Sequence, residues 1–211
     1  MKHLIIPLVF LSGLATGQPV YNVPFGSSGN MIELTVENSS TILQSGLTVK
    51  AIHTPSWLHF EQPNATITEL SGGAQQTARF SFSVDKAAPI NSEQTVTFTV
   101  TGSSGQEWTK LITLKVSPPQ SFELFQNYPN PFNPVTTIAY QLPSESKVSL
   151  LIYNLLGQVV TTLVNADRVA GFHQEVWDAS TVSSGLYVYR ITATDKSGNQ
   201  VVRNKTMSLI R

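Results

Sequence analysis

From Gln18 onward, apolar residues recur at every second position, and this period constrains the fold more than any other feature. Residues 32–36 and 96–100 are two such runs. Glu or Thr stands at each position between the apolar residues. Alternation places one set of side chains on the buried face of a strand and the other set toward solvent. No long stretch follows a helical period. The pattern therefore predicts an all-β protein.

The punctuation of these runs predicts two domains. Clusters of Gly, Ser, Asn and Pro separate the runs, which is typical of a two-sheet sandwich of the immunoglobulin type. Pro118 and Pro119 then interrupt the pattern, because neither can donate to a strand ladder. We predict two immunoglobulin-like β-sandwich domains in tandem, at residues 18–117 and 127–211, joined by a linker at residues 118–126.

The first 17 residues have the layout of a secretory signal peptide. Lys2 is followed by an apolar run from Leu4 to Leu14, and residues 15–17 are small enough for a signal peptidase. About eleven residues rise roughly 16 Å as a helix, about half of a 30 Å hydrocarbon core. We predict a signal peptide at residues 1–17, with a buried N-terminal strand as the alternative, and no transmembrane segment.

Charge and cysteine usage exclude several classes of protein. Thirteen basic and thirteen acidic side chains give a formal net charge of zero. Nucleic acid is therefore not an expected partner, because phosphate binding depends on clustered Lys and Arg. The absence of cysteine excludes disulfides, thiol nucleophiles and soft metal sites.

The titratable residues suggest no chemistry. His53, His59 and Glu61 could converge on a metal, but their spacing matches no known ligand pattern. The sequence offers no two titratable side chains that we can nominate as a general acid and a general base. We therefore predict no catalytic residue, no cofactor, no metal and a protein that is not an enzyme. The competing enzyme hypothesis would need a cleft with two converging titratable groups.

The second domain contains a motif pattern that begins with three prolines in six positions, at residues 129–134. Such prolines fix an extended, rigid entry to the sandwich. The residues that carry the pattern are Asn130, Pro131, Phe132, Asn133, Pro134, Gly157, Gly171, Trp177 and Asp178. In this order and spacing, residues 122–211 resemble the C-terminal sorting domain of proteins exported by the type IX secretion system of Bacteroidota. That fold is also similar to the immunoglobulin-like domain of flagellar hook-capping proteins.

The resemblance implies a secreted or outer cell-surface protein. It implies recognition by an outer-membrane secretion translocon and a sortase, followed by release or by attachment to surface lipopolysaccharide. The last strand, at residues 201–210, is the expected recognition element, because an edge strand offers unpaired backbone groups.

The sorting signal that we predict comprises Gly185, Tyr187, Lys205, Met207, Leu209 and Arg211. The two basic residues are expected to present outward charge, while Met207 and Leu209 pack inward. Gly185 is expected to allow close backbone approach near Tyr187. Asp178 is interpreted as a turn cap and His173 as structural. Arg211 departs from the family pattern, in which a second lysine closes the strand.

The first domain is the cargo. Residues 55–60, with the strands that follow, are loosely similar to sandwich modules of the BACON family, which are found beside carbohydrate-active enzymes. Trp57 and Trp108 are candidates for stacking on sugar rings, although burial is the favoured interpretation for Trp57. We predict a domain for adhesion or interaction, with a carbohydrate-binding accessory module as the alternative and polysaccharide as its partner.

Overall fold

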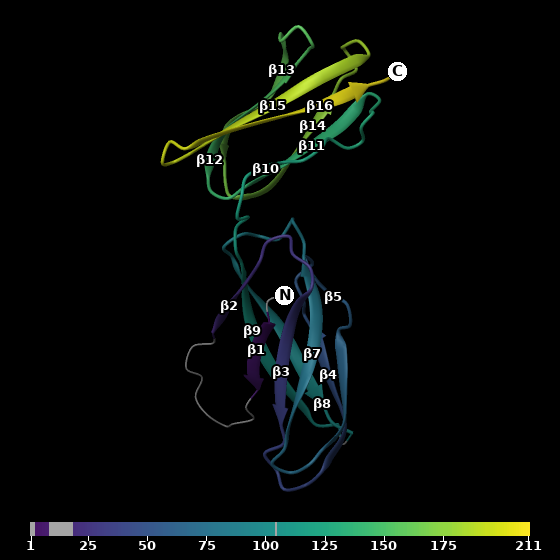
Figure 1. Ribbon diagram of the computed structural model, residues 1–211. Coiled ribbons are helices and arrows are strands. Elements are labelled where there is room, and N and C mark those ends of the chain that lie inside the picture. The colour runs from purple at the N-terminus through teal and green to yellow at the C-terminus, as the bar shows by residue number, and fades with distance from the viewer. Residues whose placement is uncertain (1–2, 9–18, 104) are drawn as a thin grey trace. The chain divides into compact units, whose positions relative to one another are not determined.

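The chain is divided into two compact units, Met1–Ser117 and Pro118–Arg211. The computed structural model describes residues 3–8, 19–103 and 105–211, and within them all regular elements are strands (Figure 1). The prediction of an all-β chain built from immunoglobulin-like sandwiches is confirmed. The boundary falls where Pro118 and Pro119 interrupt the alternation.

The first unit is a sandwich of two sheets. Its strands are β1 (His3–Leu8), β2 (Val20–Val23), β3 (Asn30–Glu37), β4 (Gln44–Ile52), β5 (Leu58–Phe60), β6 (Asn64–Leu70), β7 (Gln75–Val84), β8 (Glu93–Thr101) and β9 (Glu107–Val116). One sheet has the order β1-β3-β7-β5 and the other β2-β9-β8-β4-β6. β1 on β3 and β2 on β9 are parallel pairs, and the remaining pairs are antiparallel.

Alternating side chains build the core of this unit. Along β3, Ile32, Leu34 and Val36 are at most 1% exposed, and the residues between them are half-buried. Phe80 of β7 and Phe98 of β8 meet edge to face with ring centroids 5.0 Å apart, joining the two sheets. Burial of each such ring stabilises the fold by about 2–3 kcal/mol. The period of two in the sequence is therefore the direct cause of the sandwich.

The expected signal peptide falls largely outside the described residues. Its residues 3–8 form β1, which pairs with β3 from His3 opposite Met31 to Leu8 opposite Val36. A strand at this place agrees with the alternative expectation of an N-terminal strand. Removal of residues 1–17 from the exported protein stays a prediction.

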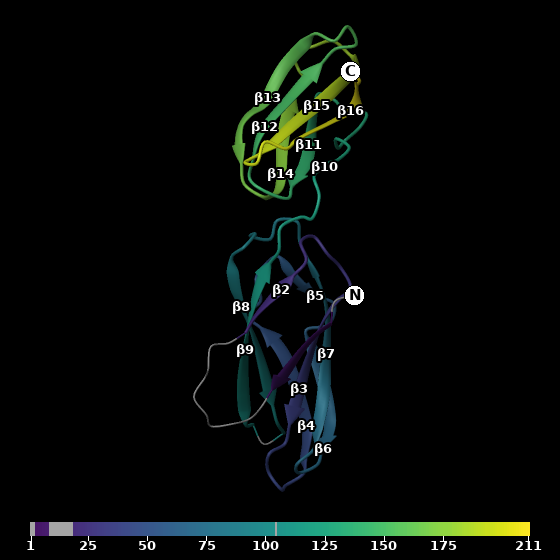
Figure 2. The same cartoon turned by 60° about the vertical axis from the view of Figure 1, so that its left-hand side comes forward.

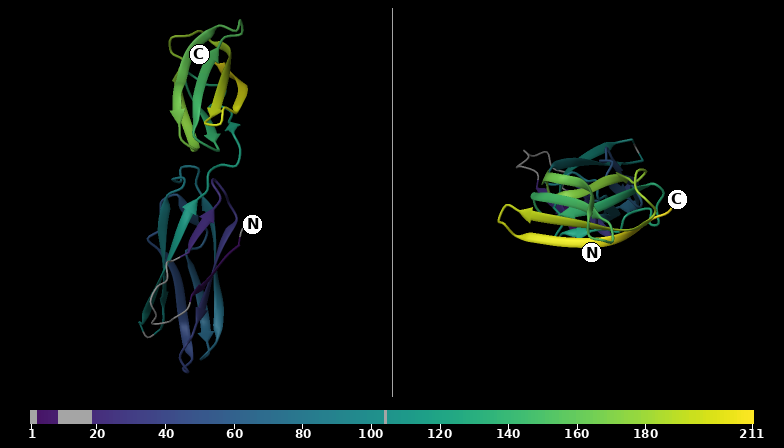
Figure 3. Two further views of the ribbon diagram at one scale, coloured as in Figure 1. Left: turned by 90° about the vertical axis from the view of Figure 1, so that its left-hand side faces the viewer. Right: turned by 90° about the horizontal axis from the view of Figure 1, so that it is seen from above.

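The second unit is also a two-sheet sandwich (Figures 2 and 3). Its strands are β10 (Glu123–Leu124), β11 (Val135–Leu142), β12 (Ser146–Tyr153), β13 (Val159–Arg168), β14 (Gly171–Asp178), β15 (Gly185–Asp195) and β16 (Gln200–Leu209). The sheet orders are β10-β11-β14 and β13-β12-β15-β16. β16 pairs in antiparallel fashion with β15 and lies at the edge of its sheet.

The segment expected to be a linker is shorter in the structure. β10 lies within residues 118–126 and pairs with β11, and the Phe125 amide donates to the Ala139 carbonyl at 2.9 Å. Leu124 is buried in the second core. Burial of this apolar side chain attaches residues 122–126 to the second domain. The prediction of the linker was based on Pro118 and Pro119 and did not take Leu124 into account.

Limited proteolysis of the full chain should cut first at residues 120–121, which are exposed. Strands on both sides lie in hydrogen-bonded sheets and should resist a protease of broad specificity such as proteinase K. Mass spectrometry should find two protected fragments that end near this site. A first cut within β10, or a single protected core, would contradict the division into two domains.

Candidate sorting surface and ligand cavity

The proline-rich motif lies against the end of the terminal strand. The Phe132 amide donates to the Ser208 carbonyl at 2.9 Å, and the Phe132 carbonyl accepts from the Ile210 amide at 3.0 Å. The side-chain oxygen of Asn130 accepts from the Ser208 amide at 2.9 Å. The Pro134 carbonyl accepts from the Ala179 amide at 2.9 Å. The motif therefore closes the outer edge of the end of β16.

Three aromatic residues of the predicted pattern pack under this edge. The ring centroid of Trp177 lies 5.5 Å from that of Phe132 and 5.4 Å from that of Tyr187. All three side chains are buried, and the Tyr187 hydroxyl donates to the Ser183 carbonyl. Residues that are far apart in the sequence thus form one cluster in the second core.

Other motif residues shape turns and strand ends. A carboxylate oxygen of Asp178 accepts from the Ser180 amide at 2.9 Å, which confirms its interpretation as a turn cap. Gly157 lies between β12 and β13 with a φ of 77°, a left-handed conformation that favours glycine. Gly171 is buried at the start of β14, opposite Leu142. Pro131 and Asn133 are exposed on either side of Phe132.

The structure confirms the expected inward packing at two positions of the terminal strand. Met207 and Leu209 are each 1% exposed, so they pack inward. Lys205 is half-buried, and its contribution of outward charge stays a prediction. A spacing of two residues places it on the same face of β16 as Met207. Arg211 is exposed, and its guanidinium donates to the Ala179 carbonyl at 3.3 Å and also to the Ser180 carbonyl.

Gly185 does not serve close packing either. A Cβ built on this residue would meet no atom within 4 Å, so the expected close backbone approach is absent. Its φ of 154° is a conformation that side chains with a Cβ rarely adopt. Glycine is therefore required here by the backbone at the start of β15.

One half of the edge of β16 remains open. The outward groups of β16 belong to its even-numbered residues, as the bonds of Ser208 to the motif show. Gln126 donates to the outward carbonyl of Thr206 at 2.8 Å. The Val202 carbonyl accepts only from the adjacent Arg203 guanidinium. Within the described chain, the Asn204 backbone receives no hydrogen bond from another segment. Residues 202–204 thus form the accessible part of the edge.

Asn127 organises the entry to the motif, a role that the sequence did not reveal. Its backbone amide donates to the Tyr189 hydroxyl at 3.0 Å, and that hydroxyl donates to the Phe125 carbonyl at 2.9 Å. Its side-chain amide donates to the Pro129 carbonyl and to the Thr136 hydroxyl, at 3.0 and 2.9 Å. Burial raises the pKa of Tyr189 to about 12. This buried network fixes the path of the chain from β10 into the motif.

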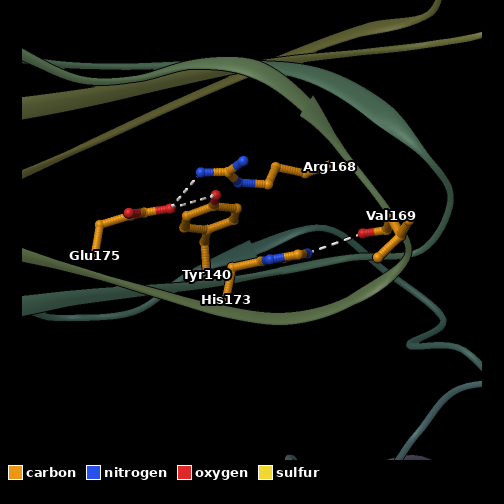
Figure 4. Close-up of polar contacts among 5 residues, drawn as sticks. All are labelled: Tyr140, Arg168, Val169, His173 and Glu175. Atoms are coloured by element: carbon orange, nitrogen blue, oxygen red, sulfur yellow. Dashed lines mark hydrogen bonds and ion pairs between the residues drawn. The ribbon is translucent and has the colours of Figure 1, made fainter.

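A second polar cluster joins the two sheets (Figure 4). The Tyr140 hydroxyl donates to a carboxylate oxygen of Glu175 at 3.4 Å, and Arg168 pairs with the same oxygen at 3.1 Å. The His173 ring stacks on the Tyr140 ring at 5.2 Å, and its Nε2 is 2.9 Å from the Val169 carbonyl. Burial raises the pKa of Tyr140 to about 12, so this hydroxyl is protonated at neutral pH. The cluster stabilises the sandwich, in agreement with the structural interpretation of His173.

The two tryptophans of the first domain differ in exposure. Trp57 is 7% exposed and belongs to the core, which confirms the favoured interpretation of burial and rules out the alternative of stacking on sugars. Trp108 is half-buried and lines a cavity of about 280 Å³ at one end of the sandwich. Gln44, Gln106 and Glu37 also line this cavity. An aromatic ring and several polar side chains therefore surround one space.

The proposed metal ligands do not converge. Among the described residues, no three side chains of His, Asp or Glu are placed to hold a metal ion. The His59 ring lies 3.7 Å from the Asp85 carboxylate. Within the same part of the chain, no helix is long and apolar enough to cross a membrane.

Comparison with protein families decides the nature of the second domain. The family model described as "Secretion system C-terminal sorting domain" matches residues 126–204. The second unit is a type IX secretion sorting domain. The matched range contains the proline-rich motif, the aromatic cluster and Gly185, whereas Lys205 and the residues after it lie beyond the match. The sorting domain marks this chain for export to the outer cell surface or the extracellular space.

Solved structures with similar backbones share little sequence with the chain. The CupB2 chaperone of Pseudomonas aeruginosa is 11% identical, with coverage of 91% of this chain and 99% of that one and a TM-score of 0.31. Dimeric latent PorU of Porphyromonas gingivalis is 14% identical, with coverage of 94% and 19% and a TM-score of 0.37. The periplasmic chaperone SfaE is 13% identical, with coverage of 94% and 100% and a TM-score of 0.33. No curated protein matches the sequence.

The sorting domain should lose stability above pH 10. Burial raises the pKa of Tyr140 and the pKa of Tyr189 to about 12 from the ordinary 10.0. The unfolded chain therefore releases these protons at lower pH than the folded chain does. Stability that is fully present below pH 10 is lost as the pH rises through 12, by about 2 kcal/mol for each hydroxyl. Urea unfolding of the full chain below pH 10 and near pH 12 measures this loss.

Two variants test which hydroxyl is responsible. Tyr189→Phe should show a smaller loss over this pH range, because one of the two buried hydroxyls is gone. Tyr128→Phe, at a side chain that is 81% exposed, should keep the full loss. Equal losses in the two variants would contradict the assignment to Tyr189.

Proposed function

We propose that this chain is a non-enzymatic protein whose sorting domain delivers an immunoglobulin-like domain for adhesion or interaction to the outside of the cell. The family match over a separate compact unit carries the proposal. The roles of the titratable residues support it, since His173 stacks and bonds within the sandwich and Tyr140 stays protonated. The proposal includes removal of the tail by a sortase and attachment of the product to lipopolysaccharide.

We also propose that the translocon reads the sorting domain by adding a strand to the open part of β16. An edge strand with unpaired backbone groups is a template for an extended segment of another chain. The motif and Gln126 occupy the edge from Thr206 onward. Residues 202–204 are left for the partner, and the Asn204 amide points away from β15.

Proline at position 204 should block export without unfolding the domain. Asn204→Pro removes an amide that points outward, so the ladder to β15 keeps its hydrogen bonds, and edge strands tolerate proline. In the native host, immunoblots of periplasm, cell surface and medium should show the variant retained in the periplasm. The expected decrease in exported protein is about tenfold or more, since the lost contact is part of each recognition event.

Asn204→Ala is the matched control, because it changes the side chain and retains the amide. It should be exported at the level of the original chain. Normal export of Asn204→Pro, with the domain shown to be folded by circular dichroism, would contradict strand addition at this site. Normal export after deletion of residues 202–211 would overturn the sorting role of β16 altogether.

The cavity beside Trp108 supports a second candidate function, the carbohydrate-binding accessory module. Sugar-binding sites combine the face of an aromatic ring with amide and carboxylate groups that bond to hydroxyls. Trp108 provides the ring, while Gln44, Gln106 and Glu37 provide the polar groups. Its volume of about 280 Å³ suits a small part of a polysaccharide.

If this second function holds, a glycan array should identify a ligand, and Trp108→Phe should weaken its binding by about three- to tenfold. Gln106→Ala should weaken binding by a similar factor, because a hydroxyl of the sugar loses its partner. Isothermal titration calorimetry measures both effects. Trp57→Phe is the control and should bind normally, since Trp57 does not line the cavity. An array without a ligand would contradict this function.

A further inference from the structure

β3 lies between β7 and β1 in its sheet, and β1 belongs to the predicted signal peptide. The buried core residues that the structure describes in the first domain run from Val23 onward, so all of them are retained when residues 1–17 are removed. β3 then becomes an edge strand. We propose that removal of β1 opens β3 as a docking edge for the β3 strand of a second copy of this chain. This inference rests on the exported, processed form under the proposed function.

The backbone of β3 is oriented for such pairing. The Asn38 amide donates to the Ala74 carbonyl at 3.0 Å, so the backbone of Asn38 faces the β7 side. Orientation alternates along a strand of an antiparallel pair. The amides and carbonyls of Met31, Glu33, Thr35 and Glu37 therefore face the opposite side, where β1 lies. Without β1, these eight backbone groups, one amide and one carbonyl from each residue, form an unpaired template.

Burial restricts the register of the pairing. Pairing with β7 fixes Ile32, Leu34 and Val36 toward the core of each copy, so only the backbone groups of odd-numbered residues are directed at the second copy. In an antiparallel pair related by a two-fold axis, hydrogen-bonded partners must then both be odd-numbered residues of β3. Most of the strand stays paired only in the registers that place Glu33, Leu34 or Thr35 on the two-fold axis.

Charge selects one of these registers. With Glu33 on the axis, the glutamate meets its own copy, and with Thr35 on the axis, Glu33 meets Glu37. Like charges directly opposite each other destabilise a pair of strands. With Leu34 on the axis, Glu33 lies opposite Thr35 of the second copy and Met31 lies opposite Glu37 of the second copy. This register alone avoids direct repulsion.

The negative charge of Glu33, next to the axis, is already compensated by Arg79 of the same copy. The Glu33 carboxylate pairs with Arg79 of β7 at 2.9 Å, and the Glu33 side chain is only 17% exposed. Two such edges can approach without two bare carboxylates between them. The contact is isologous and closes on itself, so it yields a dimer with a continuous sheet and no fibre. Because the contact involves a single strand, we expect a dissociation constant of about 10–100 μM.

Sedimentation velocity of two purified forms tests the proposal. Residues 18–211 should dimerise over about 5–500 μM, a range that spans the expected dissociation constant. The chain of residues 1–211, in which β1 covers β3, should stay monomeric. A processed form that stays monomeric, or a longer form that dimerises equally, would overturn the proposal.

Substitutions at Thr35 test the register. In residues 18–211, Thr35→Glu places a second carboxylate opposite Glu33 of the other copy and should weaken dimerisation about tenfold. Thr35→Lys places an ammonium group there and should strengthen dimerisation by a similar factor. Equal dimerisation by these two variants would show that β3 is not the contact.

Thr66 on the exposed edge strand β6 of the other sheet provides the matched control. Thr66→Glu and Thr66→Lys should leave the dissociation constant unchanged. Thermal unfolding of each variant establishes that it is folded. These measurements use purified protein, so they can be made whether or not the export proposal is correct. A monomeric result would overturn the dimer and would not affect the export proposal.

Discussion

Backbone pairing between Phe132 and the end of β16 holds the second domain together. It joins the segment between β10 and β11 of one sheet to the last strand of the other sheet. The aromatic cluster beneath it brings Trp177 and Tyr187 to the same place, and the network around Asn127 fixes the approach. The residues that identify the sorting domain in the sequence are thus also the residues that close its core.

Much of the fold could be predicted from the sequence because burial acts on it with a simple period. Ile32, Leu34 and Val36 show that period, and each lies in the core. The same rule, applied to β16, assigns Lys205 to the same face as Met207, where its side chain is half-buried. The attachment of β10 to the second domain depends on one apolar residue, Leu124, next to two prolines. That signal is too short for periodicity to detect.

The candidate sites were less predictable, because they depend on contacts between distant segments. The cluster of Tyr140, Arg168 and Glu175 has no sequence motif, and its members come from three strands. Trp57 and Trp108 were both candidates for stacking on sugars, yet only Trp108 lines a cavity. Arg211 is held by carbonyl groups of a loop that precedes β15, a contact that strand propensity does not encode.

The position of β16 in chain order affects when the sorting domain can function. β16 is the final strand of this sandwich to leave the ribosome, and the backbone of Phe132 lacks its partners Ser208 and Ile210 until then. Before that moment Phe132 lacks the strand that holds it, and the rings of Trp177 and Tyr187 lack their cover. A polypeptide that stops short of β16 therefore cannot assemble a finished tail. Under the proposed recognition of the folded tail, export is reserved for chains whose synthesis has passed this point, and the fold itself acts as a check on translation.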